Sequence, residues 1–188
     1  MNKVDAIKDI AVVNEILKYL LKQSERNHLL FALGIYTGLR ISDYLKFRVI
    51  DVNGRQSIEV IENKTRKENS IPINDELMPI IRRYCSGKRD YEYLFKSKKG
   101  KNTPISRVQA YRIMKSAARE FDLKCIGCHT TRKTYGYILY QLTGDIELVK
   151  SCLNHSDSKI TARYIGIDKE EKDQAIKNIS FQRKKKRE

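Results

Sequence analysis

The chain has 188 residues, of which 40% are hydrophobic and 32% are charged. This composition is typical of a folded domain with a charged surface and excludes a disordered chain, and no apolar run approaches the roughly 18 residues that a membrane-spanning helix needs. The 38 Lys and Arg exceed the 23 Asp and Glu, and the net charge of +15 favours a polyanionic partner, most often nucleic acid.

Helical periodicity covers the first part of the chain. Residues 5–22 carry apolar side chains at helical spacing. Ser24 is placed to cap a second helix, which Gly38 ends, and a short helix is expected at residues 43–47. The expected apolar face of the first helix consists of Ile7, Ile10, Val13, Leu17 and Leu20 or Leu21.

A change to strand periodicity follows between residues 49 and 73. The segments SIEVIE and NSIPI alternate apolar and polar residues, and the basic, turn-forming segment NKTRKE separates them. This pattern predicts a small antiparallel hairpin or three-stranded sheet, with Pro72 in a strand near its edge.

Helical patterns return in the second half. Thr103-Pro104 and Asp145 are start signals, because Thr and Asp cap helices and Pro suits the first helical turn. No linker rich in Gly, Ser or Pro divides the chain, so the sequence predicts a single α+β domain, mostly α-helical with a small antiparallel β-sheet. The further helices are expected at residues 75–85, 104–121, 130–142, 145–152 and 169–179.

The segment CIGCH at residues 125–129 has the spelling of a c-type haem attachment site. A haem or zinc site is disfavoured, because a structural zinc site needs four ligands and the chain offers one close Cys pair and three histidines. Reduced thiols are expected instead, with Cys125 and Cys128 as small buried residues ahead of a helix that begins at His129. We therefore expect no cofactor and no metal.

Four separated segments carry residues that suit chemistry at one phosphate group. TGLRISDYL sets an arginine just after the helix-ending glycine, and IENKTRKENSIPI sets a lysine in the hairpin turn. HTTRKTYGY sets a histidine and an arginine three residues apart, hence on one helix face. In LNHSDSKITARYIGI a tyrosine follows a histidine by nine residues. The candidate catalytic residues are Arg40, Lys64, His129, Arg132, His155 and Tyr164.

Together these segments resemble the catalytic domain of the tyrosine recombinases, the phage-integrase family, over residues 29–167. TGLRISDYL is similar to the family's first arginine box, HTTR to its H-x-x-R box and LNHSDSKITARYI to its box of histidine and tyrosine. The pattern K-x-x-K-E-x-x-I-P is similar to its lysine turn, where register favours Lys64 over Lys67. Glycine is more usual where Asn154 stands. The resemblance implies the tyrosine recombinase catalytic-domain fold, a 3′-phosphotyrosyl intermediate and no need for ATP or a divalent metal.

The residue types suit such a reaction. A tyrosine can store the energy of a phosphodiester as a covalent ester, so Tyr164 is the expected nucleophile. Guanidinium groups can hold the extra negative charge of a pentacoordinate phosphate, which is the role expected of Arg40 and Arg132. Lys64 is expected to protonate the leaving 5′ oxygen, and His129 to exchange a proton with the tyrosine hydroxyl.

Two further residues complete the expected site. His155 is expected to donate a hydrogen bond to the phosphate, and Asp43 to orient Arg40 or cap a helix. Taken singly, each candidate also has a structural interpretation, such as a surface salt bridge for an arginine. The occurrence of all these residues together favours the catalytic interpretation over the structural one, because two of only three histidines occupy the family's two histidine positions.

The expected activity is that of a site-specific DNA recombinase, of the integrase or invertase type, acting on double-stranded DNA. Residues 1–167 are expected to form the catalytic domain and residues 168–188 a C-terminal helix with a basic tail. The family's usual N-terminal DNA-clamp domain is expected to be absent, and the chain is either a minimal recombinase or a fragment of a longer integrase. Base contacts are expected from one exposed helix. The residues named for these contacts are Arg107, Gln109, Arg112 and Lys115.

The resemblance also implies an assembly and a place of action. We expect a homotetramer on DNA, joined through the C-terminal helix docked on a neighbouring subunit, or alternatively a helix folded back on its own domain. Accessory DNA-bending proteins are possible partners, and no membrane partner is expected. A bacterial cytoplasmic protein acting for a mobile element fits these expectations.

Three alternatives remain open from the sequence. Within the family, the chain could resolve chromosome or plasmid dimers rather than integrate or invert DNA. In a different class, it could be a catalytically silent relative that regulates a site by occupying it, although the complete set of site residues argues against silence. A redox or haem protein is the third alternative.

Overall fold

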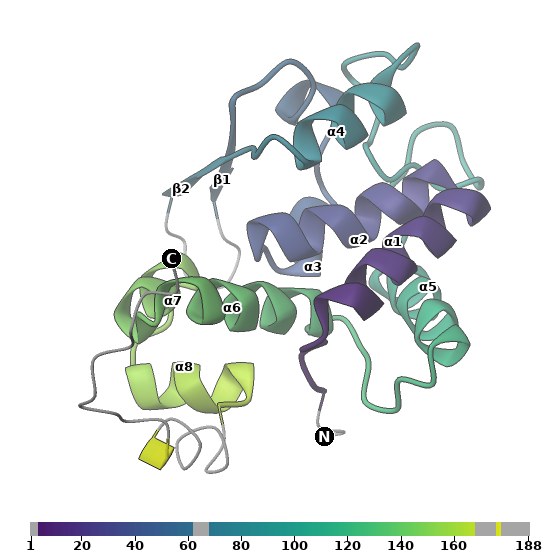
Figure 1. Cartoon of the computed structure of the whole chain (residues 1–188). Coiled ribbons are helices and arrows are strands. Elements are labelled where there is room, and N and C mark those ends of the chain that lie inside the picture. The colour runs from purple at the N-terminus through teal and green to yellow at the C-terminus, as the bar shows by residue number, and fades with distance from the viewer. Residues whose placement is uncertain (1–3, 62–67, 168–175, 178–188) are drawn as a thin grey trace, which may run out of the picture.

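The computed structural model describes residues 4–61, 68–167 and 176–177, and most of them are helical (Figure 1). The hairpin and α4 lie on one side of the α1–α2 pair, and α6, α7 and α8 lie on the other. No helix of this described part is long and apolar enough to cross a membrane. The elements are α1 (Ile10–Gln23), α2 (Glu25–Thr37), α3 (Ile41–Tyr44), a 3₁₀ turn (Val49–Asp51), β1 (Ser57–Ile61), β2 (Glu68–Pro72), α4 (Leu77–Cys85), α5 (Arg107–Glu120), α6 (Thr130–Thr143), α7 (Ile146–Cys152) and α8 (Ser158–Ile165). The predicted class, mostly helical with a small antiparallel sheet, is confirmed.

The first helix begins at Ile10 rather than at residue 5, so its predicted start is wrong. Asp9 has extended backbone torsions, and its side chain accepts a hydrogen bond from Ala11 N at 2.7 Å, which starts the helix only after this cap. Residues 4–9 run without regular secondary structure. The predicted apolar face is also wrong at its start, because Ile10 is 57% exposed whereas Ile7 is buried through the preceding segment.

The hairpin is confirmed by the pairing of β1 with β2. The strands are antiparallel, from Ser57 opposite Pro72 to Ile61 opposite Glu68. Burial alternates along β1, where Ile58 is buried and Ile61 is exposed, as expected for a strand with one face on the core. Of the two predicted alternatives, the described residues contain the two-stranded form.

The start of α5 was predicted three residues too early. Ser106 Oγ accepts a hydrogen bond from Gln109 N at 3.2 Å, and Gln109 Oε1 accepts one from Ser106 N at 2.8 Å. This reciprocal capping satisfies two backbone donors, so the helix begins at Arg107 rather than at Pro104. Pro104 instead forms an isolated bridge with Lys96.

The helix α8 was not predicted, although its start signal is present. The side chain of Asp157 accepts a hydrogen bond from Ile160 N at 2.9 Å and caps the helix. Eight residues are too few for periodicity to stand out against the neighbouring turn, so the cap was the available signal. The helix predicted at 169–179 lies outside the described residues except for 176–177, which are helical.

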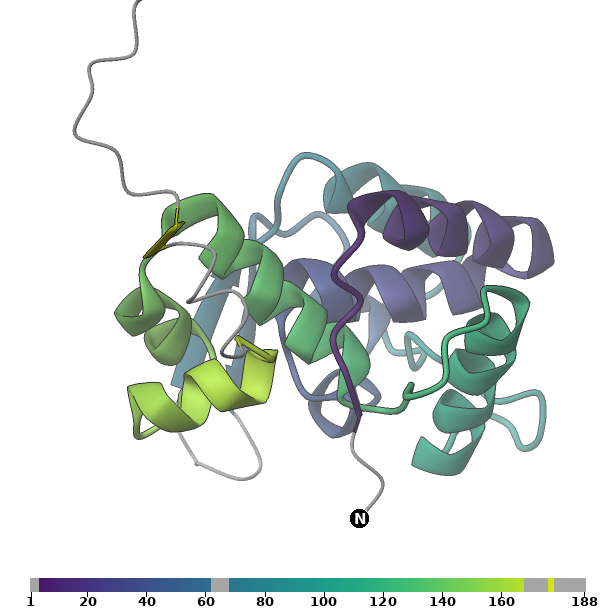
Figure 2. The same ribbon diagram turned by 60° about the horizontal axis from the view of Figure 1, so that its bottom comes forward.

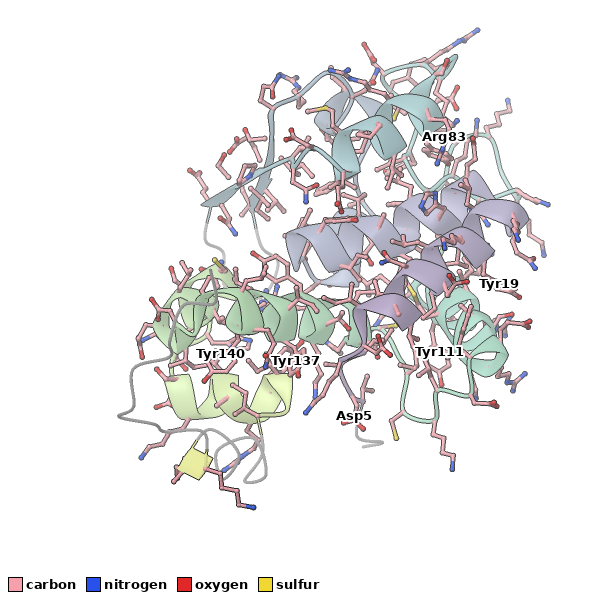
Figure 3. The ribbon with its side chains drawn as sticks, viewed as in Figure 1. Asp5, Tyr19, Arg83, Tyr111, Tyr137 and Tyr140 are labelled. Atoms are coloured by element: carbon pink, nitrogen blue, oxygen red, sulfur yellow. The ribbon has the colours of Figure 1, made fainter. Side chains whose placement is uncertain are left out.

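Two apolar clusters hold these elements together. The main cluster joins α1, α2, α4, α5 and the hairpin, with Leu29, Leu33 and Ile58 among its fully buried side chains. The smaller cluster lies between α6, α7 and α8 and is centred on Val149, Leu153 and Ile165. Figure 3 labels Tyr137 and Tyr140, which extend from α6 toward α8 and pack on this second cluster. The helix α8 therefore rests on a small core of its own.

The contact between α2 and α6 depends on a glycine. These helices pack against each other, and Gly34 is buried at the crossing. A Cβ at this position would lie 2.6 Å from Thr131 Cβ, which is closer than such atoms approach in real structures. The close approach brings the end of α2 near the start of α6.

Replacing Gly34 with alanine is expected to destabilise the protein, because α2 and α6 would have to separate. The strain exceeds the gain of up to about 1 kcal/mol from the higher helix propensity of alanine. We expect urea denaturation to show an unfolding free energy lower by about 1–3 kcal/mol. The exposed Lys22→Ala variant on α1 is the control and should stay within about 0.5 kcal/mol of the parent. A Gly34→Ala variant as stable as the parent would contradict this packing.

Candidate active site

The turn after α2 places Arg40. Gly38 has φ +65°, a left-handed conformation that glycine adopts without strain, and it ends α2 as the sequence predicted. Arg40 then stands at the N-cap of α3, half-buried. The short helix was predicted at 43–47 and lies a little earlier. Asp43 is buried in it, and its backbone N donates to Arg40 O at 2.8 Å, so the two residues lie in one tight turn.

Arg132 is buried and joins two distant segments. Its side chain is 2% exposed. Nη1 donates to Gly38 O at 2.6 Å, and Nη2 donates to Leu153 O. Gly38 lies two residues before Arg40, and Leu153 lies two residues before His155. One guanidinium therefore connects the segment of Arg40 with the segment of His155. A guanidinium has five N–H groups, and these two bonds do not exhaust its capacity.

The turn between α7 and α8 presents His155. Asn154 has φ +47°, a left-handed conformation, which gives a physical reason why glycine is more usual at this position in the resemblance. Asparagine tolerates this conformation better than most residues. His155 Nδ1 lies 3.2 Å from Thr161 Oγ1, a contact that fixes the ring against α8.

Tyr164 lies on α8 beside His155. The two rings meet edge to face, with their centroids 4.9 Å apart, and Lys133 Nζ lies 5.0 Å from the centroid of the tyrosine ring. Burial raises the pKa of Tyr164 above its ordinary value, and the charges of Arg132 and Arg40 offset part of that rise. The Tyr164 hydroxyl is buried beside the Arg132 guanidinium, in a contact that falls short of good hydrogen-bond geometry. A protonated hydroxyl thus lies in the field of two guanidinium groups.

His129 stands at the N-cap of α6, so the prediction that a helix begins here is confirmed. The side chain is half-buried. Its pKa is lowered from the ordinary value, first by burial and then by the positive charges of Arg107, Arg132, Arg40 and Lys133. The imidazole is therefore neutral near pH 7 and able to accept a proton. Of the two histidines, His155 is the one with a ring contact to Tyr164.

A groove of about 820 Å³ runs from His129 along α5 (Figure 3 labels Tyr111 on this helix). Of the four residues predicted for DNA contacts, Arg107 and Lys115 line it, whereas Gln109 and Arg112 do not. Gln109 belongs to the capping pair at the start of α5. The other cations of the groove are Arg119 and Lys124.

Three residues at the site were not predicted. Tyr111 lines the groove, is 37% exposed and lies next to Lys115, whose Nζ is 5.8 Å from its ring centroid. Its signal was available, because it stands four residues from both Arg107 and Lys115 and thus on the same helix face. Lys133, which lies over the Tyr164 ring, and Lys8, which donates to Gly166 O at the end of α8, gave no such signal, because these contacts depend on the tertiary fold.

Other sequence predictions concern Lys64, the two cysteines before His129 and metal binding. Lys64 lies outside the described residues. The expectation of two buried cysteines is wrong for Cys125, which is exposed, while Cys128 is half-buried. The reason is that this segment forms the wall of the groove rather than the core. No group of three or more His, Cys, Asp or Glu within residues 4–61, 68–167 and 176–177 is arranged to hold a metal ion.

The arrangement combines a buried hydroxyl, two guanidinium groups and a neutral imidazole. Guanidinium groups fixed by buried contacts can stabilise charge on a phosphate without reorganising during a reaction. The hydroxyl of Tyr164 lies in their field, where a phenolate would be stabilised once its proton is lost. This set of groups suits nucleophilic attack on a phosphate ester.

Comparison with known sequences gives a consistent result. The profile of the phage integrase family matches residues 9–171. The chain is 44% identical over 170 residues to "Probable integrase/recombinase YoeC" of Bacillus subtilis, covering 90% of this chain and 93% of that protein. It is 28% identical over 162 residues to "Tyrosine recombinase XerD" of Oceanobacillus iheyensis, covering 81% of this chain and 54% of that protein.

Solved structures share the fold. A crystal structure of XerA recombinase superposes with a TM-score of 0.76 at 16% identity, covering 96% of this chain and 66% of that one. XerH recombinase bound to its palindromic difH substrate after cleavage gives 0.70 at 21% identity, covering 94% of this chain and 54% of that one. The chain thus spans nearly all of the Bacillus relative but little more than half of XerD and XerH.

Proposed function

Because the chain belongs to the phage integrase family, that of the tyrosine recombinases, we propose that it is a site-specific DNA recombinase that breaks and rejoins DNA through a 3′-phosphotyrosyl intermediate. The observation that carries this proposal is the buried hydroxyl of Tyr164, packed beside His155 and within the field of Arg132 and Arg40. A silent DNA-binding relative would have no use for a desolvated tyrosine facing two guanidinium groups.

The chemistry follows from these positions. Tyr164 Oη attacks the scissile phosphate, forms the phosphotyrosyl ester and displaces the 5′ oxygen. Arg40 and Arg132 stabilise the negative charge that develops on the phosphate. His129, neutral near pH 7, takes the proton of the tyrosine hydroxyl. Lys64 is proposed to protonate the leaving 5′ oxygen, on the resemblance of its turn alone.

His155 completes the proposed set. Its Nδ1 lies 3.2 Å from Thr161 Oγ1, and this contact orients the ring against α8. The edge-to-face contact also holds the ring beside the nucleophile. We therefore propose that His155 donates a hydrogen bond to the scissile phosphate.

The proposed partner is double-stranded DNA. The net charge of +15 and the cations along the groove beside α5 support this partner. Arg107 and Lys115 share this groove with His129, and Tyr111 adds an aromatic ring between them. Gln109 and Arg112 are exposed on other parts of the helix. We propose that the groove-lining residues approach the DNA next to the cleaved phosphate, and that Gln109 and Arg112 contact DNA less directly.

The assembly on DNA is proposed to be a homotetramer in the bacterial cytoplasm, joined through the C-terminal helix. An apolar groove of about 440 Å³ between α1, α2 and α6 supports a docking surface on the catalytic domain. Two of its lining residues are unusually exposed for apolar side chains, with Ile10 at 57% and Leu142 at 78%. Service to a mobile element and help from accessory DNA-bending proteins belong to the same proposal.

Integration or inversion is preferred over dimer resolution. YoeC, named an integrase/recombinase, matches this chain over almost its whole length at 44% identity. XerD matches at 28% over about half of its own length. The higher sequence identity to YoeC than to XerD supports the hypothesis of an integrase rather than a dimer resolvase.

A covalent trap tests the proposed function. Purified protein is mixed with labelled duplexes from the DNA that flanks its own gene, each nicked so that cleavage releases a short fragment and prevents rejoining. The products are run on a denaturing gel with EDTA present. We expect a protein-linked DNA band, with the adduct assigned to Tyr164 by mass spectrometry. DNA binding at low salt without any such band, across all duplexes, would instead favour the silent DNA-binding relative.

The pH dependence of cleavage follows from His129. A lowered pKa keeps its imidazole neutral down to a pH below the ordinary value of about 6.5. We expect the rate of covalent product to be constant from pH 8 to pH 7 and to fall by about tenfold per pH unit once the pH drops below the lowered pKa. Single-turnover rates on a nicked duplex give this profile. An inflection above pH 6.5, or the same inflection in a His129→Gln variant, would contradict the role of His129.

A further inference from the structure

The segment before α1 contacts the three segments that carry His129, Arg132 and Tyr164. Residues 4–9, here called the N-terminal strap, precede α1. They run from the bottom of the molecule past the start of α6 up to α1 (Figure 2). Figure 3 labels Asp5 on this strap, below α6 and between α8 and α5. The strap is close in space to groups that are more than a hundred residues away in sequence.

The first contacts of the strap are with the segment of His129 and the helix of Arg132. Asp5 N donates to Cys125 O at 2.8 Å, four residues before His129. Ile7 N donates to Thr134 Oγ1 at 2.9 Å, two residues after Arg132. The side chain of Ile7 is 4% exposed and belongs to the main apolar cluster. The strap is therefore anchored to the larger core.

The next residue reaches the helix of the nucleophile. Lys8 Nζ donates to Gly166 O at 3.0 Å and lies 5.1 Å from the ring centroid of Tyr137. Gly166 is the C-cap of α8 and follows Tyr164 by two residues. A cation at a helix C-terminus is favourable, because the last carbonyls lack helical partners and carry partial negative charge.

This contact matters because of how α8 is supported. The helix rests on the small cluster of Val149, Leu153 and Ile165, apart from the main core. Lys8 follows Ile7 directly, so it ties the C-terminal end of α8 to the larger core through the strap. Tyr164 lies within the last turn of this helix, where the backbone frays most easily. A shift of about 1 Å in a reacting group is enough to cost much of a reaction rate.

We propose that Lys8 is a positioning residue for the nucleophile. Its bond to Gly166 O fixes the last turn of α8, so that the hydroxyl of Tyr164 stays in the field of Arg132 and Arg40. This inference rests on the proposed function. It adds that the N-terminal strap, rather than the four family segments alone, sets the geometry of the cleavage step.

A phosphate contact by Lys8 is the competing explanation. A cavity of about 890 Å³ between the strap and α8 is lined by four cations, Lys8, Lys133, Lys159 and Arg163, with Tyr164 also in its wall. A cation there could simply attract DNA. The bond to Gly166 O joins Lys8 to the end of α8, and the ring of Tyr137 on α6 lies beside the ammonium group, which favours positioning.

Three variants separate these explanations. Lys8→Met keeps the length of the side chain and removes the donor, and Lys8→Arg restores a donor. Lys159→Met removes an exposed positive charge from the same cavity without touching Gly166 O. Each protein is assayed for single-turnover cleavage of a nicked duplex at saturating protein, and for DNA affinity from 50 to 300 mM salt. Hydrogen exchange is followed at the amides of Gly166 and Ile167, which both donate to Ala162 O.

We expect Lys8→Met to cleave about tenfold more slowly with unchanged affinity and salt dependence, and Lys8→Arg to return to within about twofold of the parent. Exchange at Gly166 and Ile167 should be faster in Lys8→Met alone, with Lys159→Met like the parent in every measurement. Unchanged cleavage in Lys8→Met, no rescue by arginine, or a loss of affinity with a salt slope smaller by about one would overturn the inference. If the parent forms no covalent product, the proposed function fails, and unchanged exchange in Lys8→Met would independently refute the role of the strap.

Discussion

Replacing Tyr164 with phenylalanine is expected to abolish the covalent product without weakening the fold. The hydroxyl is the proposed nucleophile, so the rate of cleavage should fall by at least roughly 10⁴-fold. The same hydroxyl is buried beside the Arg132 guanidinium in a contact short of good hydrogen-bond geometry, and such a contact contributes little stability. The unfolding free energy should therefore stay within about 1 kcal/mol of the parent value. Urea denaturation and the covalent trap measure the two effects.

A matched control separates the nucleophile from its neighbours. Tyr140 is another half-buried tyrosine of the small cluster under α8, and Tyr140→Phe should retain the covalent product. DNA affinity should be unchanged in Tyr164→Phe, since the aromatic ring remains in place and only the hydroxyl is lost. A covalent band that persists in Tyr164→Phe would place the nucleophile elsewhere. A loss of more than about 1 kcal/mol of stability would mean that the contact with Arg132 is a full hydrogen bond that the fold depends on.

The sequence predicted the candidate residues because their chemistry is local to short segments. The interval from His155 to Tyr164 and the interval from His129 to Arg132 are readable without any tertiary information. The structure places Arg40, His129, Arg132 and Tyr164 in one electrostatic environment, as the pKa shifts of His129 and Tyr164 reflect. Their catalytic roles remain predictions.

Long-range contacts could not be predicted in this way. The bond of Arg132 to Gly38 O joins residues 94 positions apart, and that of Lys8 to Gly166 O joins residues 158 apart. Both acceptors are backbone carbonyls, which every residue has, so no sequence pattern marks them. The same limit applies to Ile7, whose burial depends on where the strap lies rather than on helical periodicity.

Local competition between signals explains the errors in the helices. Thr103-Pro104 and Ser106 both carry capping signals, and the reciprocal bonds between Ser106 and Gln109 decide for the later start. The later start also affects the predicted DNA contact of Gln109, because this side chain belongs to the helix cap and does not line the groove. Asp9 likewise caps α1 within a run that periodicity alone extends to residue 5.

Arg132 is the residue whose conservative replacement should have the widest effect. Its guanidinium donates to Gly38 O and to Leu153 O, and its charge offsets part of the rise that burial causes in the pKa of Tyr164. A lysine keeps the charge, but its single ammonium cannot reproduce the fork that reaches two carbonyls and a phosphate. We expect Arg132→Lys to lower the unfolding free energy by about 2–4 kcal/mol, because at least one buried carbonyl loses its donor. Cleavage should fall by roughly 10²–10³-fold.

The two effects of Arg132→Lys are separable. Cleavage is measured well below the midpoint of thermal unfolding, so that the variant is folded, and stability is measured by urea denaturation. Arg163→Lys is the matched control, because Arg163 is exposed on α8 next to Tyr164, and both quantities should stay near the parent values. Full cleavage with reduced stability would make Arg132 a purely structural connection between α2 and α7. Reduced cleavage with full stability would mean that its carbonyl bonds contribute little, and that the segments of Arg40 and His155 are held together by other contacts.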